Sequence, residues 1–303
     1  MVGSANLDVV LRVAEVPAAG RTVLATSRST SAGGKGLNQA VAAARAGATT
    51  TLVAAVGHDD AAEPLLAALA EAGAVTAEVR RASAPTGTAY VVVSDAGDNA
   101  IVVHPGANAT LTSLGSTGTE AVRSADVLLA QLEVPTGVVG EAAATARAGG
   151  TVVVLNASPV PPPGPDLDVL RDLLRLVDLL VVNEHEATAL SGVADPRAAA
   201  AALAAGGREV VVTLGAAGAC HVDSTGAERL EPGLPATVRD TTGAGDTFAG
   251  VLAACRAEGT PTAVALRRAV AGGALAVERD GAVPSIPTAA EVDARLRQEP
   301  VVA

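Results

Sequence analysis

The feature that most constrains the fold of this chain is a series of short apolar runs rich in valine and leucine. Alanine-rich segments of helical length separate runs at residues 51–56, 126–129, 151–155, 178–182 and 209–214. Strands that read as continuous apolar runs are buried on both faces, and their alternation with helices is typical of parallel sheets. The sequence therefore predicts a three-layer α/β fold with a doubly wound, mostly parallel sheet.

Two segments, residues 8–32 and 86–104, break this rhythm. Each contains two stretches of β character, and in the second segment these stretches flank the turn Asp95-Ala96-Gly97-Asp98. This pattern indicates an antiparallel pair in each segment, and together the pairs predict a small sheet that projects from the core. We therefore assign residues 1–7, 33–85 and 105–303 to an α/β core, and residues 8–32 and 86–104 to a β-sheet lid.

The composition excludes several classes of protein. The chain has 303 residues, of which 49% are hydrophobic and 17% charged, and no apolar run is long enough to cross a membrane. A net charge of -11 and an aromatic content of 1% argue against binding of nucleic acid. The two cysteines form no disulfide framework and the start lacks a signal peptide, so we expect a cytoplasmic protein.

A run of small residues precedes the helical pattern that ends near Glu258. Gly243, Ala244 and Gly245 lie at this helix N-terminus, where unpaired backbone N–H groups and the helix dipole attract anions. The segment is therefore a candidate anion hole. Asp246, one residue further on, either serves as a base beside the anion or only complements the helix dipole.

Polar residues in the first third of the chain suggest a site for a polar ligand. Asn6 and Asp8 stand two apart on a strand and share a face, which suits a polyol. Gly34, Lys35 and Asn38 lie in or near a glycine-rich turn, where the backbone can approach a ligand closely. The alternative is an ordinary turn with Asn38 facing solvent.

Two further sets of residues follow predicted strands. Glu133 comes after the strand at 126–129, at the carboxyl edge where ligand crevices of α/β sheets lie. Asn183 and Glu186 follow the strand at 178–182 and have the spacing of a capping box. The functional alternative is that Glu186 holds Mg²⁺ through water. The sequence contains neither a Walker loop nor a Rossmann glycine motif.

The motifs resemble, in order, those of the ribokinase-like sugar kinase family, and the resemblance covers essentially the whole chain. The segments that carry it are Gly33-Gly34-Lys35-Gly36-x-Asn38-Gln39-Ala40, Asn183-x-x-Glu186, Thr213-Leu214-Gly215-x-x-Gly218, Asp240-Thr241-Thr242-Gly243-Ala244-Gly245-Asp246-Thr247-Phe248 and Gly281-Ala282-Val283-Pro284-Ser285. The resemblance implies an α/β core with a four- to five-stranded lid.

The resemblance also implies roles for individual residues. Asp246 would be the general base on the primary hydroxyl of the sugar, and the N–H groups of residues 243–245 would hold the transferred phosphoryl group. The sugar would bind Asn6, Asp8, Gly34, Lys35, Asn38, Glu133 and Asp246. ATP and Mg²⁺ would lie along Asn183, Glu186, Thr213, Gly215, Gly218 and Gly245, with Glu186 reaching Mg²⁺ through water.

A monovalent cation is a further implication of the resemblance. Its ligands, which match the segments that bind K⁺ in the family, would be Asp240, Thr242, Ala276, Arg279, Gly281 and Ser285. An all-oxygen site of this kind suits a large, weakly hydrated ion. The alternative is that Asp240 only caps its loop and Ser285 only ends a turn.

The implied activity is ATP-dependent phosphorylation of D-ribose at O5. The alternatives are a kinase for deoxyribose, another sugar or a nucleoside, and a sugar sensor without activity, which would be expected to lose Asp246. Because lid edges are exposed strands, we expect a homodimer that pairs through the lid. Two departures from the family are Arg267 and Arg268 near the expected adenine position, and a first strand so short that we expect a start upstream of Met1.

Overall fold

The computed structural model describes residues 1–298 of the chain. The strands are β1 (Asn6–Val13), β2 (Ser27–Gly33), β3 (Ala54–Gly57), β4 (Val79–Ala82), β5 (Gly87–Ser94), β6 (Asn99–His104), β7 (Val127–Ala130), β8 (Val152–Asn156), β9 (Leu179–Asn183), β10 (Glu209–Thr213), β11 (Gly218–Val222) and β12 (Glu228–Pro232). The α-helices are α1 (Lys35–Arg45), α2 (Ala62–Glu71), α3 (Gly115–Arg123), α4 (Thr136–Gly149), α5 (Pro165–Leu173), α6 (Glu184–Ser191), α7 (Pro196–Ala204), α8 (Ala244–Ala257), α9 (Thr262–Ala276) and α10 (Ala289–Gln298). Short 3₁₀ turns are η1 (Gly106–Thr110), η2 (Leu174–Leu176), η3 (Gly215–Ala217) and η4 (Val283–Ser285).

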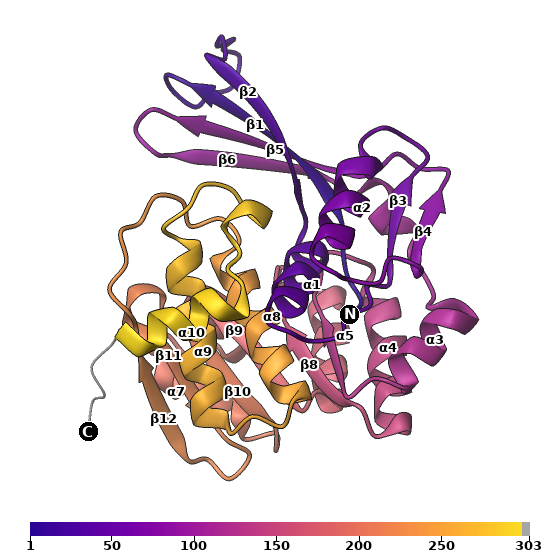
Figure 1. Ribbon diagram of the computed structural model, residues 1–303, viewed down its shortest axis with the longest axis vertical. Helices are drawn as coiled ribbons and strands as arrows, with labels where there is room; N and C mark the ends of the chain where they lie inside the picture. The colour runs from indigo at the N-terminus through magenta and orange to yellow at the C-terminus, as the bar shows by residue number, and fades with distance from the viewer. Residues whose placement is uncertain (299–303) are drawn as a thin grey trace.

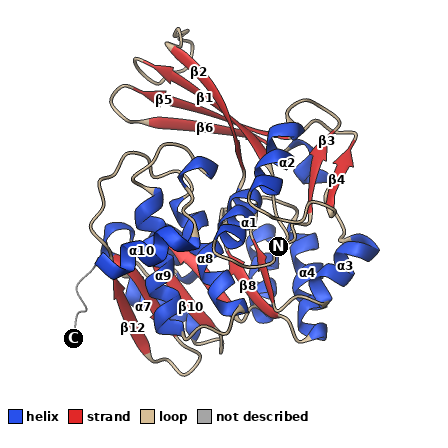
Figure 2. Cartoon of the chain, viewed as in Figure 1, coloured by secondary structure: helices blue, strands red, loops and turns tan. Residues whose placement is uncertain are grey.

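The main sheet has the order β12-β11-β10-β9-β8-β7. Figures 1 and 2 show it among the helices in the lower part of the molecule. Strands β7 to β10 are parallel, and β11 and β12 add an antiparallel edge. Adjacent residues of one strand enter different core clusters: Leu180 packs with α4, α5 and α7, whereas Leu179 packs with α8 and α9. Helices therefore cover both faces of this sheet, which confirms the predicted doubly wound α/β class.

A second sheet of four strands has the order β2-β1-β5-β6 and projects from the helical body (Figure 1). The pairs β1/β2 and β5/β6 are antiparallel, as the sequence predicted, and β1 pairs with β5 in parallel. This central pairing joins the two chain excursions into one sheet. We call this sheet the lid.

The apolar run at 51–56 behaves differently from the other four. Among the strands of residues 1–298, its strand β3 pairs with β4 alone, in a separate two-stranded sheet. Val53 reaches the main sheet through a parallel bridge to Val2, which in turn bridges Ala130 of β7. The strand that connects the Val53 segment to β7 is short because it consists only of residues Met1 to Gly3. Within residues 1–298, no helix combines the length and apolar content that crossing a membrane requires.

Candidate active site

The polar residues predicted from the sequence gather where the carboxyl ends of β7, β8 and β9 meet the N-termini of α1 and α8. Strand β1 of the lid crosses this region, because Asn6 pairs with Gly33, which lies two residues before α1. The carboxyl edge of a parallel sheet is where α/β folds form ligand crevices. The fold therefore places the candidate site in the position that this architecture favours.

Asp246 lies in the first turn of α8 and is only 7% exposed. Its Oδ2 accepts a hydrogen bond of 3.0 Å from Asn38 Nδ2, and its Oδ1 accepts one of 2.9 Å from Gln39 Nε2. Both donors belong to α1. This helix can pack closely on α8 because Gly250 has no side chain, whereas a Cβ atom there would collide with Ala42 and with the backbone of Gln39. Two amides therefore fix the orientation of a buried carboxylate.

The amide of Gln39 is itself held on every side. Its Nε2 also donates to Asn156 Oδ1 at 2.9 Å, and its Oε1 accepts from Gln131 Nε2 at 2.5 Å. Asn156 in turn donates to the carbonyl oxygen of Val181 at 3.0 Å. Because each partner fixes which end of the next amide donates, the chain of bonds anchors the Asp246 carboxylate to β8 and β9.

Sequence reasoning assigned no role to Gln39, Gln131, Asn156 or Asn108. Asn108 supports the lid side of the site by donating from Nδ2 to Asn6 Oδ1 at 2.7 Å. One usable signal was present: Gln131 and Asn156 are polar residues at the carboxyl ends of apolar strands, as Glu133 is near β7. Gln39 gave no such signal, since its role depends on how α1 packs against α8.

Asp8 is the carboxylate of the lid strand β1. Its carboxylate forms no hydrogen bond or ion pair to the residues that the structure describes. Burial, the largest cause, and the nearby carboxylates of Glu133 and Asp246 together raise its pKa from 3.8 to about 7. An unpaired carboxyl group next to Asp246 is a ready acceptor for the hydroxyl groups of a ligand.

Glu133 and Lys35 belong to the same group of charged residues as Asp8 and Asp246. Glu133 Oε2 accepts from Ser4 Oγ at 2.5 Å and from the backbone N of Lys35 at 3.0 Å, so it caps α1, whose N-cap Gly34 has no side chain to do so. Burial opposes the charge on Lys35, but Asp246, Glu133 and Glu186 outweigh it and raise the Lys35 pKa. The ammonium group thus stays charged among carboxylates.

Two buried amide oxygens in this cluster, Asn38 Oδ1 and Gln131 Oε1, lack a donor, and the first lies beside Asp246. Asn38 Oδ1 is inaccessible to solvent and has no hydrogen-bond partner, although Asn38 Nδ2 is bound to Asp246. Leaving a buried polar atom unpaired costs about 1–3 kcal/mol, which a ligand hydroxyl would recover. Asn38 does not face solvent, so the interpretation of this segment as an ordinary exposed turn was wrong.

The small residues before α8 leave backbone donors free. Gly243 has φ of 76° at the N-cap, a conformation that favours glycine, and it packs against Ala282. Within the described chain the N–H groups of Gly243 and Gly245 have no protein acceptor, whereas Ala244 donates to the carbonyl oxygen of Thr241 at 3.3 Å. Two of the three proposed anion-binding donors are therefore open, and the third is weakly engaged.

A cavity of about 290 Å³ begins at these residues. Thr213, Gly215 and Gly218 line it together with Ala244 and Gly245. Its remaining wall is mostly apolar and includes Leu234, Val238, Phe248, Val270, Ala274 and Val277. A largely apolar cavity that ends at free backbone donors suits a flat aromatic group attached to an anion.

Asn183 and Glu186 form the capping box that their spacing predicted. Glu186 N donates to Asn183 Oδ1 and Asn183 N donates to Glu186 Oε2, both at 2.9 Å. Asn183 lies beside Thr213, its register partner on β10. The box occupies one oxygen of each side chain, so a role of Glu186 toward Mg²⁺ stays a prediction.

Asp240 joins the loop before α8 to the segment after α9. Its Oδ1 accepts from Thr242 N at 2.9 Å and its Oδ2 from Gly281 N at 2.8 Å. Burial raises its pKa, but these hydrogen bonds prevail, and the pKa lies below its usual value. Nearby, Ser285 Oγ donates to the carbonyl oxygen of Ala282 at 2.7 Å. The capping role is thus present, and it keeps the carboxylate charged.

Three arginines near α9 are engaged in ion pairs. Arg267 pairs with Glu231 at 3.1 Å, Arg268 with Asp293 at 2.8 Å and Arg279 with Glu291 at 2.5 Å. Arg267 and Arg268 therefore hold α9 to β12 and α10. Neither arginine lines the cavity, whose wall near α9 is formed by Val270, Ala274 and Val277.

The site combines the Asp246 carboxylate with acceptors for hydroxyl groups and with free backbone donors for an anion. This combination defines the class of protein, a phosphotransferase that acts on an alcohol. Comparison with known proteins specifies the family. Residues 1–289 match the family described as pfkB family carbohydrate kinase. The chain belongs to that family.

Relatives and solved structures agree with this assignment. The chain is 36% identical to a ribokinase of Haemophilus influenzae over 300 residues, which covers 96% of this chain and 95% of that protein. It is 36% identical to a ribokinase of Bacillus subtilis over 299 residues, with 98% of both covered. The structure of Arabidopsis thaliana ribokinase complexed with ribose and ATP superposes with a TM-score of 0.89 at 32% identity, covering 98% of each chain.

Proposed function

We propose that the protein is a ribokinase, which transfers the γ-phosphoryl group of ATP to O5 of D-ribose. The observation that carries this proposal is that Asp246 lies between unpaired hydrogen-bond acceptors and free backbone donors. On one side lie the unpaired acceptors Asn38 Oδ1 and Asp8, and on the other lie the free N–H groups of Gly243 and Gly245. Ribokinase relatives with 33–36% identity over most of the chain support the same substrate.

In this mechanism Asp246 accepts the proton of O5 as the oxygen attacks phosphorus. Its carboxylate is already oriented by Asn38 and Gln39, so little reorganisation is needed. Phosphoryl transfer passes through a loose transition state, and catalysis relies on position and charge stabilisation. The N–H groups of residues 243–245 supply that stabilisation at the N-terminus of α8.

Ribose is proposed to bind between the lid and the core. Asp8 and Asn38 accept hydrogen bonds from its hydroxyl groups, and Asn6, Gly34, Lys35 and Glu133 complete the contact surface. Asn6 keeps Nδ2 available because only its Oδ1 is held by Asn108, and Glu133 keeps Oε1 available because Oε2 is held by Ser4 and Lys35.

ATP is proposed to fill the 290 Å³ cavity, with its phosphates at Gly243 to Gly245 and its base against Val270, Ala274 and Val277. Thr213, Gly215 and Gly218 line the path, and Asn183 lies beside Thr213. Residues 1–298 contain no group of three or more His, Cys, Asp or Glu that would hold a metal alone. Glu186 nevertheless fits Mg²⁺, which proteins hold by one or two carboxylates together with phosphates and water, and the ion would neutralise phosphate charge.

The two loops joined by Asp240 fit a K⁺ ion. Asp240 is ionised and partly buried, and Ser285 is fully buried. The other proposed ligands are Thr242 on the first loop, Ala276 at the end of α9, and Arg279 and Gly281 on the segment after α9. Such an oxygen set suits a weakly hydrated cation, which would stiffen the loop that carries Gly243.

ADP release measured over ribose, 2-deoxyribose, hexoses and nucleosides tests the proposal. We expect ribose to have the highest kcat/KM, exceeding that of 2-deoxyribose by roughly 5- to 150-fold, because a missing hydroxyl leaves Asp8 or Asn38 unpaired. Equal values for the two sugars would favour a deoxyribose kinase. Preference for a nucleoside would move the assignment to that class, and ribose binding without turnover would indicate a sensor.

We also propose that two copies pair through the lid in the cytoplasm. Val10, Val91 and Ile101 are register partners and thus share the lid face that carries Asp8. Ile101 is 56% and Val103 49% exposed on the edge strand β6. A second lid packed here would cover these side chains and an open strand edge. Light scattering should give the mass of a dimer, and Ile101→Lys should give that of a monomer.

A further inference from the structure

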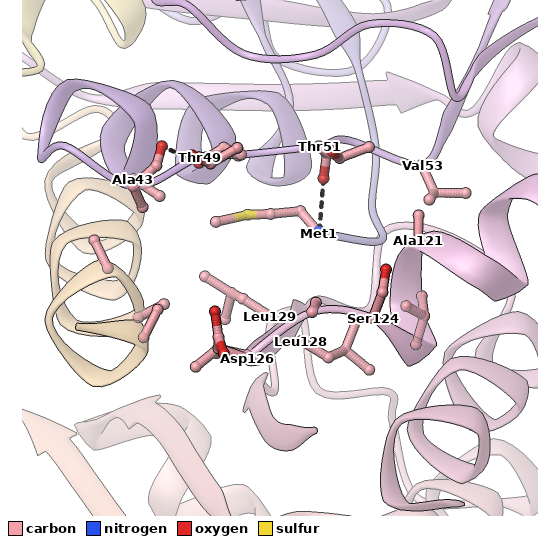
Figure 3. Close-up of a pocket in the computed structure, with 18 residues that line it drawn as sticks. Met1, Ala43, Thr49, Thr51, Val53, Ala121, Ser124, Asp126, Leu128 and Leu129 are labelled. Atoms are coloured by element: carbon pink, nitrogen blue, oxygen red, sulfur yellow. Dashed lines mark hydrogen bonds between the residues drawn. The ribbon is translucent and has the colours of Figure 1, made fainter. Parts of the chain in front are cut away.

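The backbone that leads to Asn6, the first residue of the lid strand β1, is fixed by the core. Figure 3 shows the first part of this segment, beside a cavity of about 440 Å³, where the Met1 amino group donates to Thr51 O at 2.7 Å. Val53 N donates to Met1 O at 2.8 Å, and Gly3 N donates to Val53 O at 3.1 Å. Asn6 itself pairs with both β2 and β5. With the backbone held in this way, the freedom that remains to Asn6 is the orientation of its side-chain amide.

Asn108 of the turn η1 fixes that orientation. Asn108 is 1% exposed, and its Oδ1 accepts a hydrogen bond of 3.0 Å from Ala5 N. Its Nδ2 donates to Ala5 O at 3.2 Å and to Asn6 Oδ1 at 2.7 Å. Reversing the Asn108 amide would place its oxygen against two other oxygens and its NH₂ group against an N–H, so all three bonds would be lost. The Ala5 backbone therefore sets the Asn108 amide, and the Asn108 amide sets that of Asn6.

Two glycines make room for this contact. A Cβ atom at Gly87 would collide with Asn108 Nδ2 and Asn6 Oδ1. Gly106 opens η1 with φ of 51°, and a Cβ atom there would collide with the carbonyl oxygen of Pro85. The absence of these two side chains lets η1 approach the base of β5 and enclose the two amides. A hydrogen bond enclosed in this way is stronger than one exposed to water.

The orientation of the Asn6 amide matters because acceptors predominate around the proposed sugar site. Asp8 and Glu133 are carboxylates, and Asn38 presents an Oδ1 atom that lacks a donor. Because Asn6 Oδ1 is engaged by Asn108, Asn6 presents its NH₂ group, which has no acceptor within residues 1–298. A sugar hydroxyl group both donates and accepts, whereas the ring oxygen of a sugar only accepts. The site therefore needs a donor, and Asn6 supplies one.

We propose that Asn108 is a positioning residue for the sugar, which fixes the Asn6 amide so that Asn6 donates a hydrogen bond to an oxygen atom of the substrate. Asn108 acts through Asn6, because its own Oδ1 and Nδ2 are engaged by Ala5 and Asn6. This inference rests on the proposed sugar site, and it adds the direction of one hydrogen bond and the residue that determines it.

Asn108→Asp tests the proposal through its dependence on pH. When protonated, the new carboxyl group can accept from Ala5 N and donate to Asn6 Oδ1, as the amide does. When ionised, it repels Asn6 Oδ1 and attracts the NH₂ group of Asn6, which leaves Asn6 with an acceptor toward the sugar. Burial raises the pKa of such a carboxyl group into the range between about pH 5 and about pH 9. Across that range the ratio of variant KM to original KM for the sugar should rise roughly 5- to 150-fold, with a much smaller change in kcat.

The other titratable groups near η1 are common to both proteins, so their titration affects both KM values. The charged or titratable residues on the elements around η1 are Asp8, Asp59, Arg80, Arg81 and His104. Ala109→Asp is the matched control, because it adds the same charge at an exposed position of the same turn. This control should leave the KM ratio constant with pH.

A double-mutant cycle separates positioning of Asn6 from a structural role. If Asn108 acts through Asn6, Asn108→Asp should have no effect on KM in a protein that also carries Asn6→Ala. An equal rise of KM with and without Asn6→Ala would overturn the proposal, and so would a KM ratio that stays constant with pH. A lower thermal midpoint of Asn108→Asp without a change in KM would show that Asn108 is only structural.

Asn6→Asp keeps the test decisive if Asn108→Asp does not fold. At about pH 8 one oxygen of the new carboxylate still accepts from Asn108, and the other presents an acceptor where the proposal requires a donor. KM should therefore rise at least as much as in Asn6→Ala, and a smaller rise would overturn the proposal. All comparisons use the sugar for which the original protein has the highest kcat/KM. A preference for a sugar other than ribose would thus overturn the proposed function and not this inference.

Discussion

At the scale of single residues, the account depends on how the Asp246 carboxylate is held. Asn38 and Gln39 use one amide hydrogen each to fix its two oxygens, and Gln39 is anchored by Gln131 and Asn156. The sequence pointed to Asp246 and Asn38 through their motifs. It could not show that Gln39 orients the carboxylate, because adjacent residues of a helix usually face different partners and only the packing of α1 on α8 decides which.

Replacing Gln39 tests this positioning role. Gln39→Leu should lower kcat by roughly 10- to 100-fold with a smaller change in the KM for ribose, because a misplaced base affects the transition state most. Gln39→Glu keeps the size but places a second carboxyl group against Asp246, so the acid limb of the kcat profile should move to higher pH. If both variants only unfold at lower temperature, with unchanged kcat and pH profile, Gln39 is merely structural.

Asp8 predicts a pH dependence of stability in the protein without substrate. Its pKa is raised to about 7, so folding favours the protonated form, and its contribution to stability falls as pH rises from about 4 through 7. Asp8→Asn removes this penalty. Its unfolding free energy relative to the original protein should therefore increase between pH 5 and pH 8, by on the order of 2 kcal/mol. A pH-independent difference in urea unfolding would show that Asp8 titrates normally.

At the scale of elements, the apolar runs predicted the parallel strands well. The runs at 126–129, 151–155, 178–182 and 209–214 coincide with β7, β8, β9 and β10 to within two residues at each end. The separate pairing of β3 with β4 was not predictable, because a four-residue strand gives no indication of which neighbour it will find. The edge strand β12 is largely exposed, so its sequence carries little apolar signal.

The proposed K⁺ site depends on how two segments of the chain, the loop before α8 and the segment after α9, are held together by Asp240. If K⁺ stiffens them, activity should rise when K⁺ replaces Na⁺ at constant ionic strength, and the thermal midpoint should change little. Asp240→Ala should weaken this activation, because it removes the acceptor that ties Thr242 to Gly281. Thr225→Ala, on the distant turn before β12, serves as a control that should keep the response. Equal rates in both salts would refute the cation site.

At the scale of the whole molecule, the site exists because three parts of the chain meet. The lid supplies Asn6 and Asp8, α1 supplies Lys35 to Gln39, and α8 supplies the anion-binding backbone and Asp246. A core with one phenylalanine and no tryptophan achieves this through close packing of alanine and glycine, which lets α1 and α8 approach. The ordered motifs predicted the members of the site, whereas the supporting amides required the assembled fold.

The central claim is that Asp246 is the base for phosphoryl transfer to a sugar hydroxyl, and one variant tests it most directly. Asp246→Asn keeps the shape of the side chain and removes its basicity. The account predicts that kcat for ribose phosphorylation falls by about 10²–10⁴-fold, while ribose binding measured by calorimetry stays near that of the original protein. Retention of most of the activity by Asp246→Asn, with ribose still bound, would contradict the account.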